Sequence, residues 1–218
     1  MKRIAIVIAS LLLVLGGCHH GGVRGSGVRK SEKRDLPSFT AIETSGAFEV
    51  QVNCNKPASF EIEGDDNILP LIKTEVRNGV LRVSNTKSYN TSIPISLRIT
   101  VPDLTSVRST GAGKFTVTDL QNEEFEINST GAAIVMADGR SSSVKIRSTG
   151  AGKIDAQNLH ARTAEVTVTG AASVDVYASE QLDVTVSGVG RVNYSGDAKV
   201  NKRVSGAGQV NKKQESGV

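Results

Sequence analysis

The sequence of 218 residues has no tryptophan, two cysteines, five prolines and 4% aromatic residues. Two cysteines are too few for a disulfide-stapled small domain, and the proline content excludes a collagen-like chain. The one long apolar run, Ile4 to Leu15, is interrupted only by Ser10 and is too short to cross a bilayer. A multispan membrane protein is therefore excluded, while 38% hydrophobic residues suffice for the core of one domain.

Basic residues outnumber acidic residues by 26 to 22, but the excess is unevenly placed. Seven basic and two acidic residues precede residue 36, so residues 36–218 hold 19 basic and 20 acidic side chains, a net charge of −1. The main body of the chain therefore lacks the excess of basic residues that nucleic-acid binding needs. We predict no nucleic-acid partner.

The N-terminus of the chain, up to Gly17, has the form of a bacterial lipoprotein signal peptide. The basic pair Lys2-Arg3 precedes the apolar run, which ends in Leu15-Gly16-Gly17-Cys18. This ending resembles a lipobox, in which small residues precede a cysteine whose thiolate can be alkylated to a diacylglyceryl thioether. Cleavage then frees its amine for another acyl chain, and two or three chains hold a protein stably on a membrane. We predict a signal peptide at 1–17 and a membrane anchor at Cys18.

Residues 19–35 are rich in glycine and charged side chains, and two valines are their only apolar residues. This composition is typical of a flexible linker, so we interpret residues 18–35 as the lipidated cysteine and a basic tether with a net charge of +3. His19 and His20 lack the further ligands of a metal site, and we predict neither a metal nor another cofactor. Cys54 is left without a partner and is expected to be a buried or half-buried thiol.

Residues 106–211 repeat one short phrase: Thr or Ser, then Gly, a small residue, and Gly or Ala. The first glycine of the phrase recurs roughly every 19 residues, and a fixed period of this length indicates a solenoid. Between these glycines apolar and polar residues alternate with the two-residue period of strands. We predict an all-β fold, a β-helix of about six coils of roughly 18–20 residues. The glycines expected at its corners are Gly111, Gly131, Gly150, Gly170, Gly188 and Gly206.

Alignment on these glycines predicts two rows of core side chains. The row four residues after each glycine is apolar throughout: Phe115, Val135, Ile154, Val174, Val192 and Val210. The row four residues before each later glycine fails only in the last coil: Ile127, Ile146, Val166, Val184 and Lys202. The Thr or Ser before each glycine forms a column of six hydroxyls, which we interpret as a hydrogen-bonded ladder.

Residues 36–105 alternate strongly but lack the repeat, and they contain all five prolines. We expect an irregular, strand-rich part that caps the first coil, with one helical turn at 65–69. At the far end, basic residues from Lys199 to Lys213 would protect the open strand edge or dock an acidic partner. Residues 212–218 are expected to be a tail.

Several landmarks occur in the order of a known family. They are Phe39 to Ile42, Gly46 to Val52, Asp65 to Leu69, Asn78 to Val83, Val101 to Leu104 and the glycine phrases. In this succession residues 36–211 resemble the head-GIN domain family of autotransporter-adhesin-like proteins, common among envelope lipoproteins of Bacteroidetes. The resemblance implies a right-handed β-helix-like domain and no catalytic residues, and adhesion is implied by analogy only. Lys202, in a core row, departs from the pattern.

One outward row carries charges of both signs. Asp155 and Asp175 occupy equivalent places in neighbouring coils, and Lys153 and Arg191 belong to the parallel row two positions earlier. Carboxylates stacked about 5 Å apart beside cations could bind a glycan or cleave one. Lys153, Asp155, Asp175 and Arg191 are therefore a candidate binding row, and a pectinase-like lyase or hydrolase using the two aspartates is the alternative function.

Solvated polar rows occur on the outside of any β-helix, and the scarcity of aromatics leaves few surfaces on which sugar rings could stack. We therefore predict a non-enzymatic envelope lipoprotein that acts as an adhesion, binding or structural module for a glycan or protein ligand. Formation of a homo-oligomer stays open. In lipoproteins of the family that this chain resembles, those exported to the outside of the cell often carry acidic residues soon after the cysteine. Here His19-His20-Gly-Gly follows Cys18 instead, so the resemblance implies an outer-membrane anchor with the head facing the periplasm.

Overall fold

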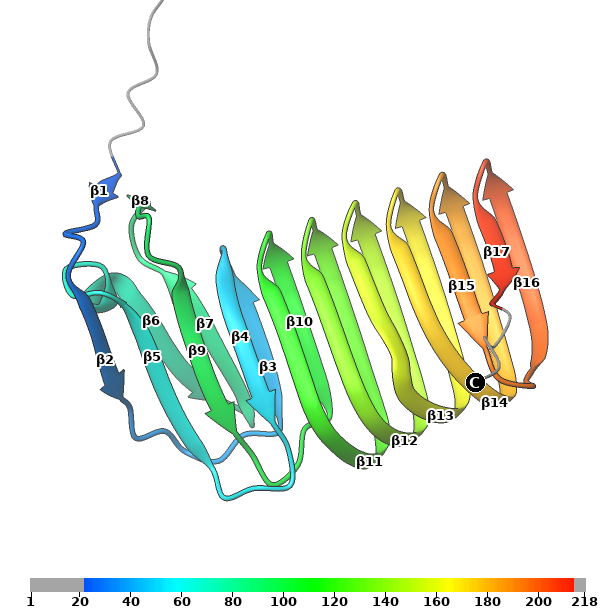
Figure 1. Ribbon diagram of the computed structural model, residues 1–218, viewed down its shortest axis with the longest axis horizontal. Coiled ribbons are helices and arrows are strands. Elements are labelled where there is room, and N and C mark those ends of the chain that lie inside the picture. The colour runs from blue at the N-terminus through cyan, green and yellow to red at the C-terminus, as the bar shows by residue number, and fades with distance from the viewer. Residues whose placement is uncertain (1–21, 214–218) are drawn as a thin grey trace, which may run out of the picture.

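The computed structural model describes residues 22–213, which are almost entirely β-strand. Four long strands each form one bent coil, and they stack side by side along the long axis of the molecule (Figure 1). They are β11 (Lys114–Gly131), β12 (Ile134–Gly150), β13 (Lys153–Gly170) and β14 (Ser173–Gly188). Neighbouring coils pair in parallel, each residue opposite its counterpart one period later. The predicted β-solenoid is confirmed.

The two predicted core rows fill the interior of the coils. In the first row, the five side chains from Phe115 to Val192 are at most 1% exposed, and only Val210 in the last coil is half-buried. In the second row, the four side chains from Ile127 to Val184 are at most 2% exposed, while Lys202 lies in solvent. Like residues therefore stack over like residues until the final coil, where the core ends.

The glycine column forms a tight corner along one edge of the solenoid. Gly150 has a φ of +128°, and a Cβ added there would lie 2.4 Å from the carbonyl oxygen of Gly131 in the coil below. A larger residue would have to adopt an unfavourable backbone conformation and would also clash with that neighbouring backbone. The six corner glycines predicted from the sequence all have positive φ.

The column continues one coil further than the sequence pattern indicated. β3 (Ala41–Ser45) and β4 (Phe48–Asn53) flank Gly46, whose φ is +134°. β3 pairs in parallel with β10 (Ser106–Gly111), with Ser45 opposite Thr110, and β4 pairs in the same way with β11. Gly46 is thus the corner glycine of a first coil that an insertion separates from the repeats.

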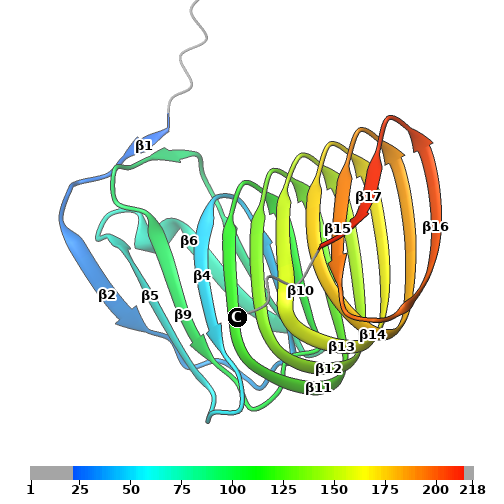
Figure 2. The same cartoon turned by 45° about the vertical axis from the view of Figure 1, so that its right-hand side comes forward.

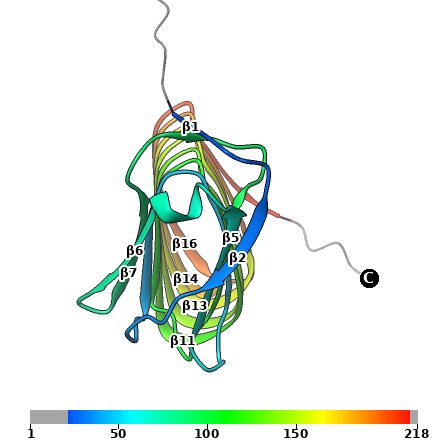
Figure 3. The same ribbon diagram turned by 90° about the vertical axis from the view of Figure 1, so that its left-hand side faces the viewer.

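The inserted segment builds the expected cap. β7 (Val80–Asn85) and β9 (Ile95–Thr100) add one more parallel layer beside β3 and β4. Two antiparallel neighbours then cover this layer, β6 (Ile72–Arg77) on β7 and β5 (Ser59–Asp65) on β9 (Figure 3). The expected helical turn is a turn at 66–68 followed by the 3-10 helix η1 (Leu69–Leu71).

The flexible tether predicted for residues 19–35 is wrong for the part that the structure describes. β1 (Val23–Arg24) pairs with β8 (Tyr89–Asn90), and β2 (Arg29–Lys33) pairs antiparallel with the outer edge of β5. Composition suggested a linker because these strands have almost no apolar side chains. They are held instead by backbone pairing with a free strand edge and by ion pairs such as Arg29 with Glu63.

The C-terminal end of the solenoid is less complete than the six coils expected. A fifth coil is split into β15 (Arg191–Ser195) and β16 (Lys199–Gly206), both paired with β14. Of a sixth coil only β17 (Gln209–Lys212) is formed, paired with β15 (Figure 2). Lys212 therefore belongs to a strand and not to the expected tail.

The expected ladder of Thr and Ser hydroxyls is not the one that the structure forms. The predicted column, for example Thr130 and Thr149, lies exposed, and its hydroxyls make no hydrogen bond within the described residues. The buried column is one residue earlier: Thr44, Ser109, Ser129 and Ser148 stack in register, and their hydroxyls have no hydrogen-bond partner there. From the next coil on, Val168, Val186 and Val204 take this position.

Candidate functional site

Three polar residues hold the N-terminal strand segment against the cap. The backbone N–H of Gly27 donates to Asp65 Oδ1 at 2.6 Å, and that of Ser26 donates to Asn67 Oδ1 at 3.0 Å. Asn67 Nδ2 in turn donates to the carbonyl of Arg24 at 2.8 Å, and the Ser26 hydroxyl donates to Asp66. We call Asp65, Asp66 and Asn67 the N-terminal clasp.

The clasp was missed from the sequence, where Asp65 to Leu69 was interpreted only as a helical turn. Asp65 is 1% exposed, and its second oxygen accepts a hydrogen bond from the hydroxyl of Thr91. A buried carboxylate at the meeting point of three chain segments fixes them together because leaving it unpaired would be costly. The available signal was the run of three consecutive polar side chains at the end of the alternating strand β5.

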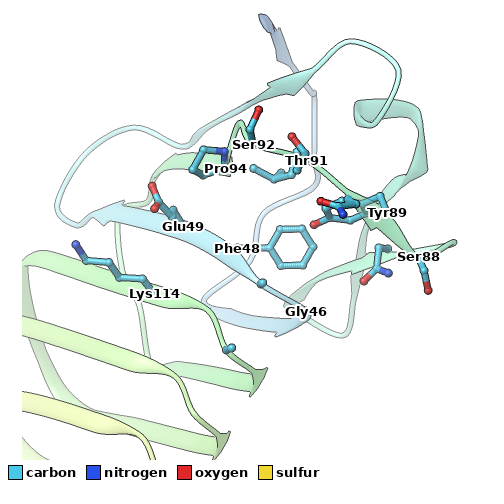
Figure 4. Close-up of a pocket in the computed structure, with 14 residues that line it drawn as sticks. Gly46, Phe48, Glu49, Ser88, Tyr89, Thr91, Ser92, Pro94 and Lys114 are labelled. Atoms are coloured by element: carbon cyan, nitrogen blue, oxygen red, sulfur yellow. The ribbon is translucent and has the colours of Figure 1, made fainter. Parts of the chain in front are cut away.

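A pocket of about 610 Å³ lies beside the clasp, between the first coil and the segment that joins β7 to β9 (Figure 4). It exists because residues 86–94 replace the tight glycine corner found in the other coils. Phe48 is buried, while Glu49 and Lys114 approach from adjacent strands, where they are register partners. The loop contributes Ser88, Tyr89, Thr91, Ser92 and Pro94.

The pocket lining offers a ligand both polar and aromatic contacts. It combines one carboxylate, one ammonium group, several hydroxyls and amides, and the aromatic rings of Phe48 and Tyr89. Burial raises the pKa of the Tyr89 phenol above its usual value of 10.0, so the hydroxyl stays protonated and remains a hydrogen-bond donor. Neither histidine nor cysteine lines the pocket, so these two common nucleophiles and bases are missing.

The predicted charged row is brought together on one face, but its carboxylates are not equivalent. Asp155 lies opposite Asp175 in the register. Two residues earlier on the same strands, Lys153 lies opposite Ser173, which in turn lies opposite Arg191 on β15. Asp175 is only 7% exposed, because Lys213 covers it with a 2.8 Å ion pair and Asn193 donates a hydrogen bond at 2.9 Å. Asp155 is half-buried and its carboxylate has no ion-pair partner among residues 22–213.

The environment of Asp175 indicates a structural role. Burial alone would raise its pKa, but the hydrogen bonds from Lys213 and Asn193 outweigh it and hold the pKa below the usual value of 3.8. A carboxylate held ionised in this way cannot serve as a general acid, and the Lys213 side chain that covers it stands where a sugar would have to approach. The geometry therefore does not support the alternative of glycoside cleavage by Asp155 and Asp175.

The remaining residues singled out in the sequence are Cys18, His19-His20 and Cys54. Cys18, the signal peptide and His19-His20 lie outside the described residues. Cys54 is a buried free thiol, as predicted, and burial together with nearby Asp103, Asp119 and Asp138 raises its pKa to about 12. Between residues 22 and 213, no group of three His, Cys, Asp or Glu side chains is arranged to hold a metal, and no helix could span a membrane.

Solved structures of bacterial proteins share this fold. An adhesin-like protein from Bacteroides fragilis is 22% identical, with a TM-score of 0.70, and the match covers 88% of this chain and 100% of that one. A protein from Parabacteroides distasonis described as a "putative lipid binding protein" is 20% identical with a TM-score of 0.56, covering 88% and 99%. No curated protein matches the chain.

The family model described as "Putative auto-transporter adhesin, head GIN domain" matches residues 38–198. This match covers the cap, the pocket, the clasp residues and all four long coils, in agreement with the resemblance of the sequence landmarks. The chain therefore belongs to the head GIN domain family of auto-transporter adhesin-like proteins.

Proposed function

We propose that the protein is a lipid-anchored, non-enzymatic binding module of the bacterial cell envelope. The observation that carries the proposal is the pocket beside the N-terminal clasp, whose mixed polar and aromatic lining suits a ligand and lacks histidine and cysteine. The lipobox Leu15-Gly16-Gly17-Cys18 supplies the anchor only a short way before β1. The family and its fold relatives agree with an adhesive or binding role.

The anchor is tested by the mass of the mature N-terminus. Full-length protein produced in a lipoprotein-processing bacterium is expected to begin at Cys18 and to carry the mass of a diacylglyceryl group and a further acyl chain. The variant Cys18→Ala should lose incorporation of a labelled fatty acid, whereas the matched control Cys54→Ala should keep it. An unmodified N-terminus would contradict the anchor.

The ligand is tested with purified protein on glycan and protein arrays. Binding through the pocket should disappear in Ser92→Trp, because the indole fills the space between Phe48 and the loop. The matched control Gln121→Trp, exposed on the opposite edge of the molecule, should bind as the wild type does. Ligand binding that survives Ser92→Trp would exclude this pocket as the site.

We further propose that the head faces the periplasm from the outer membrane. The absence of acidic residues directly after Cys18 supports this orientation. Protease added to intact cells should then leave the head uncut, and permeabilised cells should lose it. Cleavage on intact cells would show surface exposure and favour a direct adhesive role.

A further inference from the structure

The corner edge of the repeats forms a straight, uncharged surface. We define the corner ridge as the six glycines of the column with the residue before and the residue after each, from Thr110 to Ala207. Every one of these residues is a Thr, Ser, Gly, Ala or Val. The residues before and after the glycines are exposed, including Val189 at 65%. With rungs about 4.8 Å apart, the ridge is roughly 24 Å long.

A band of positive charge borders the ridge on both sides. The positions three residues before and after the six corner glycines contain six cations and no carboxylate. They are Arg108, Arg147 and Arg203 on one side and Lys114, Lys153 and Arg191 on the other. All six are exposed, and within residues 22–213 only Arg147 has an ion-pair partner, Glu126. The band belongs to the repeats, because Glu43 and Glu49 flank the first corner at Gly46.

The opposite edge, where the long strands bend, has a different character. Carboxylates on exposed or half-exposed positions outnumber the cations there: Asp119, Glu123, Glu124, Asp138 and Glu180 against Lys56, Arg140 and Arg162, the last of which pairs with Glu180. An anionic surface would therefore attract the corner ridge and repel this edge.

The described chain begins on the same side as the ridge. β1 lies at the edge where the arrowheads of the long strands end, and the end-on view places it beside the stacked corners (Figures 1 and 3). Because residues 22–33 are fixed to the cap, only the short stretch from Cys18 to Gly22 separates the proposed anchor from the rigid domain. Even fully extended, this stretch spans at most about 14 Å, so the β1 end of this edge must stay close to the membrane.

We infer that the corner ridge lies against the anionic surface of the membrane that holds the anchor, with the long axis of the solenoid parallel to the bilayer. The inference rests on the proposed lipid anchor. The exposed methyl groups of the ridge meet the headgroup region while the flanking lysines and arginines pair with lipid phosphates.

The test uses the full lipidated protein with one added cysteine, Ala151→Cys on the ridge or His160→Cys on the opposite edge. Cys54 is buried, with a thiol pKa of about 12, so a maleimide fluorophore reacts only at the added site. In vesicles of phosphatidylethanolamine and phosphatidylglycerol with a headgroup nitroxide, the label at residue 151 should be quenched severalfold more than the label at residue 160. Phosphatidylcholine vesicles should reduce this difference.

A charge variant provides the matched control. Arg108→Gln with Lys153→Gln, both outside the pocket, should weaken the ridge contact about 25-fold, at about fivefold per charge, and so remove the excess quenching. Lys56→Gln with Arg140→Gln removes equal charge from the opposite edge and should leave the excess quenching unchanged. If the mass shows the lipid and the two labels are quenched equally, the inference is overturned while the proposed anchor stands. A mass without lipid would overturn the anchor, and with it the short connection on which the inference rests.

Discussion

In the column that contains Ser129, Ser148 and Val168, the size of each side chain depends on the residue two positions after the corner glycine of the next coil. The hydroxyl of Ser129 lies 3.2 Å from the place where a Cβ on Gly152 would be, and Val168 and Val186 occupy the same relation to Gly190 and Gly208. Where the next coil has Ala in place of Gly, as at Ala172, the residue below is the smaller Ser148. The corner therefore accepts a branched side chain only beneath a glycine.

This matching makes two neighbouring serines respond in opposite ways. Ser129→Val replaces an unpaired buried hydroxyl by methyl groups beneath Gly152 and should raise the free energy of unfolding by about 1 kcal/mol. Ser148→Val removes the same kind of group but crowds Ala172, and should lower it by about 1–3 kcal/mol. Urea unfolding of the two variants measures both values. Equal effects of the two substitutions would refute the size relation.

The ion pair between Asp175 and Lys213 should make the free energy of unfolding depend on pH. The pKa of Asp175 in the folded protein lies below the unfolded value, so its contribution is present above about pH 4 and is lost as the pH falls through the folded pKa. Asp175→Asn should lower the free energy of unfolding by about 1–2 kcal/mol at pH 7, and the difference from the wild type should vanish in acid. Asp155→Asn on the neighbouring strand, without an ion pair, is the matched control and should change little at either pH. A difference that persists in acid would argue against the ion pair with Lys213.

At the scale of elements, β1 and β2 show why composition alone misjudged the N-terminal segment. A linker and an edge strand can have the same polar, glycine-rich composition, and the difference lies in partners far along the chain, here β5, β8 and the clasp. The first coil was missed for a related reason. The phrase Ser45-Gly46-Ala47 lacks the second small residue, since Phe48 follows, and the whole inserted cap separates Gly46 from Gly111.

The clasp is tested by limited proteolysis. Residues 24–34 offer trypsin five sites, which a flexible tether would expose at once. The structure predicts slow cleavage there, because the segment is paired as strand on β5 and β8. Asp65→Asn, which replaces a buried carboxylate oxygen by an amide donor, should speed cleavage at Arg24 and Arg29 more than tenfold. Asp103→Asn, outside the clasp, should not, and rapid cleavage of the wild type would restore the tether interpretation.

At the scale of the whole molecule, the repeats were predictable from the sequence because one period determines both the corners and the core rows. The glycine spacing fixes the corners, the corners fix which residues point inward, and the core rows follow down to the failure at Lys202. The pocket was not predictable, because it forms where the period is absent, between β7 and β9. The glycine alignment puts Asp155 beside Asp175, but the cover that Lys213 gives Asp175 depends on the C-terminal end of the described chain.

A regular solenoid should tolerate the removal of one entire coil. Deletion of residues 151–170 joins Gly150 to Ala171, so β12 would stack on β14 with both core rows in phase. The shortened protein should fold and unfold cooperatively, with a lower free energy of unfolding because one interface between coils is lost. Deletion of residues 151–160 is the control, since it shifts the rows out of phase and should abolish folding. Circular dichroism and urea unfolding distinguish these outcomes.

The insertion within the first coil also bears on the order in which the chain folds. Adjacent repeats pair across the length of a single coil, whereas β3 pairs with β10, and β1 with β8, only across several times that length of chain. Closing long loops is slower because more chain entropy is lost before any contact compensates for it. A growing chain would therefore nucleate in the repeats, and the ladder would extend backwards toward its N-terminus. The end that emerges first from the ribosome is thus expected to be the last part to become ordered.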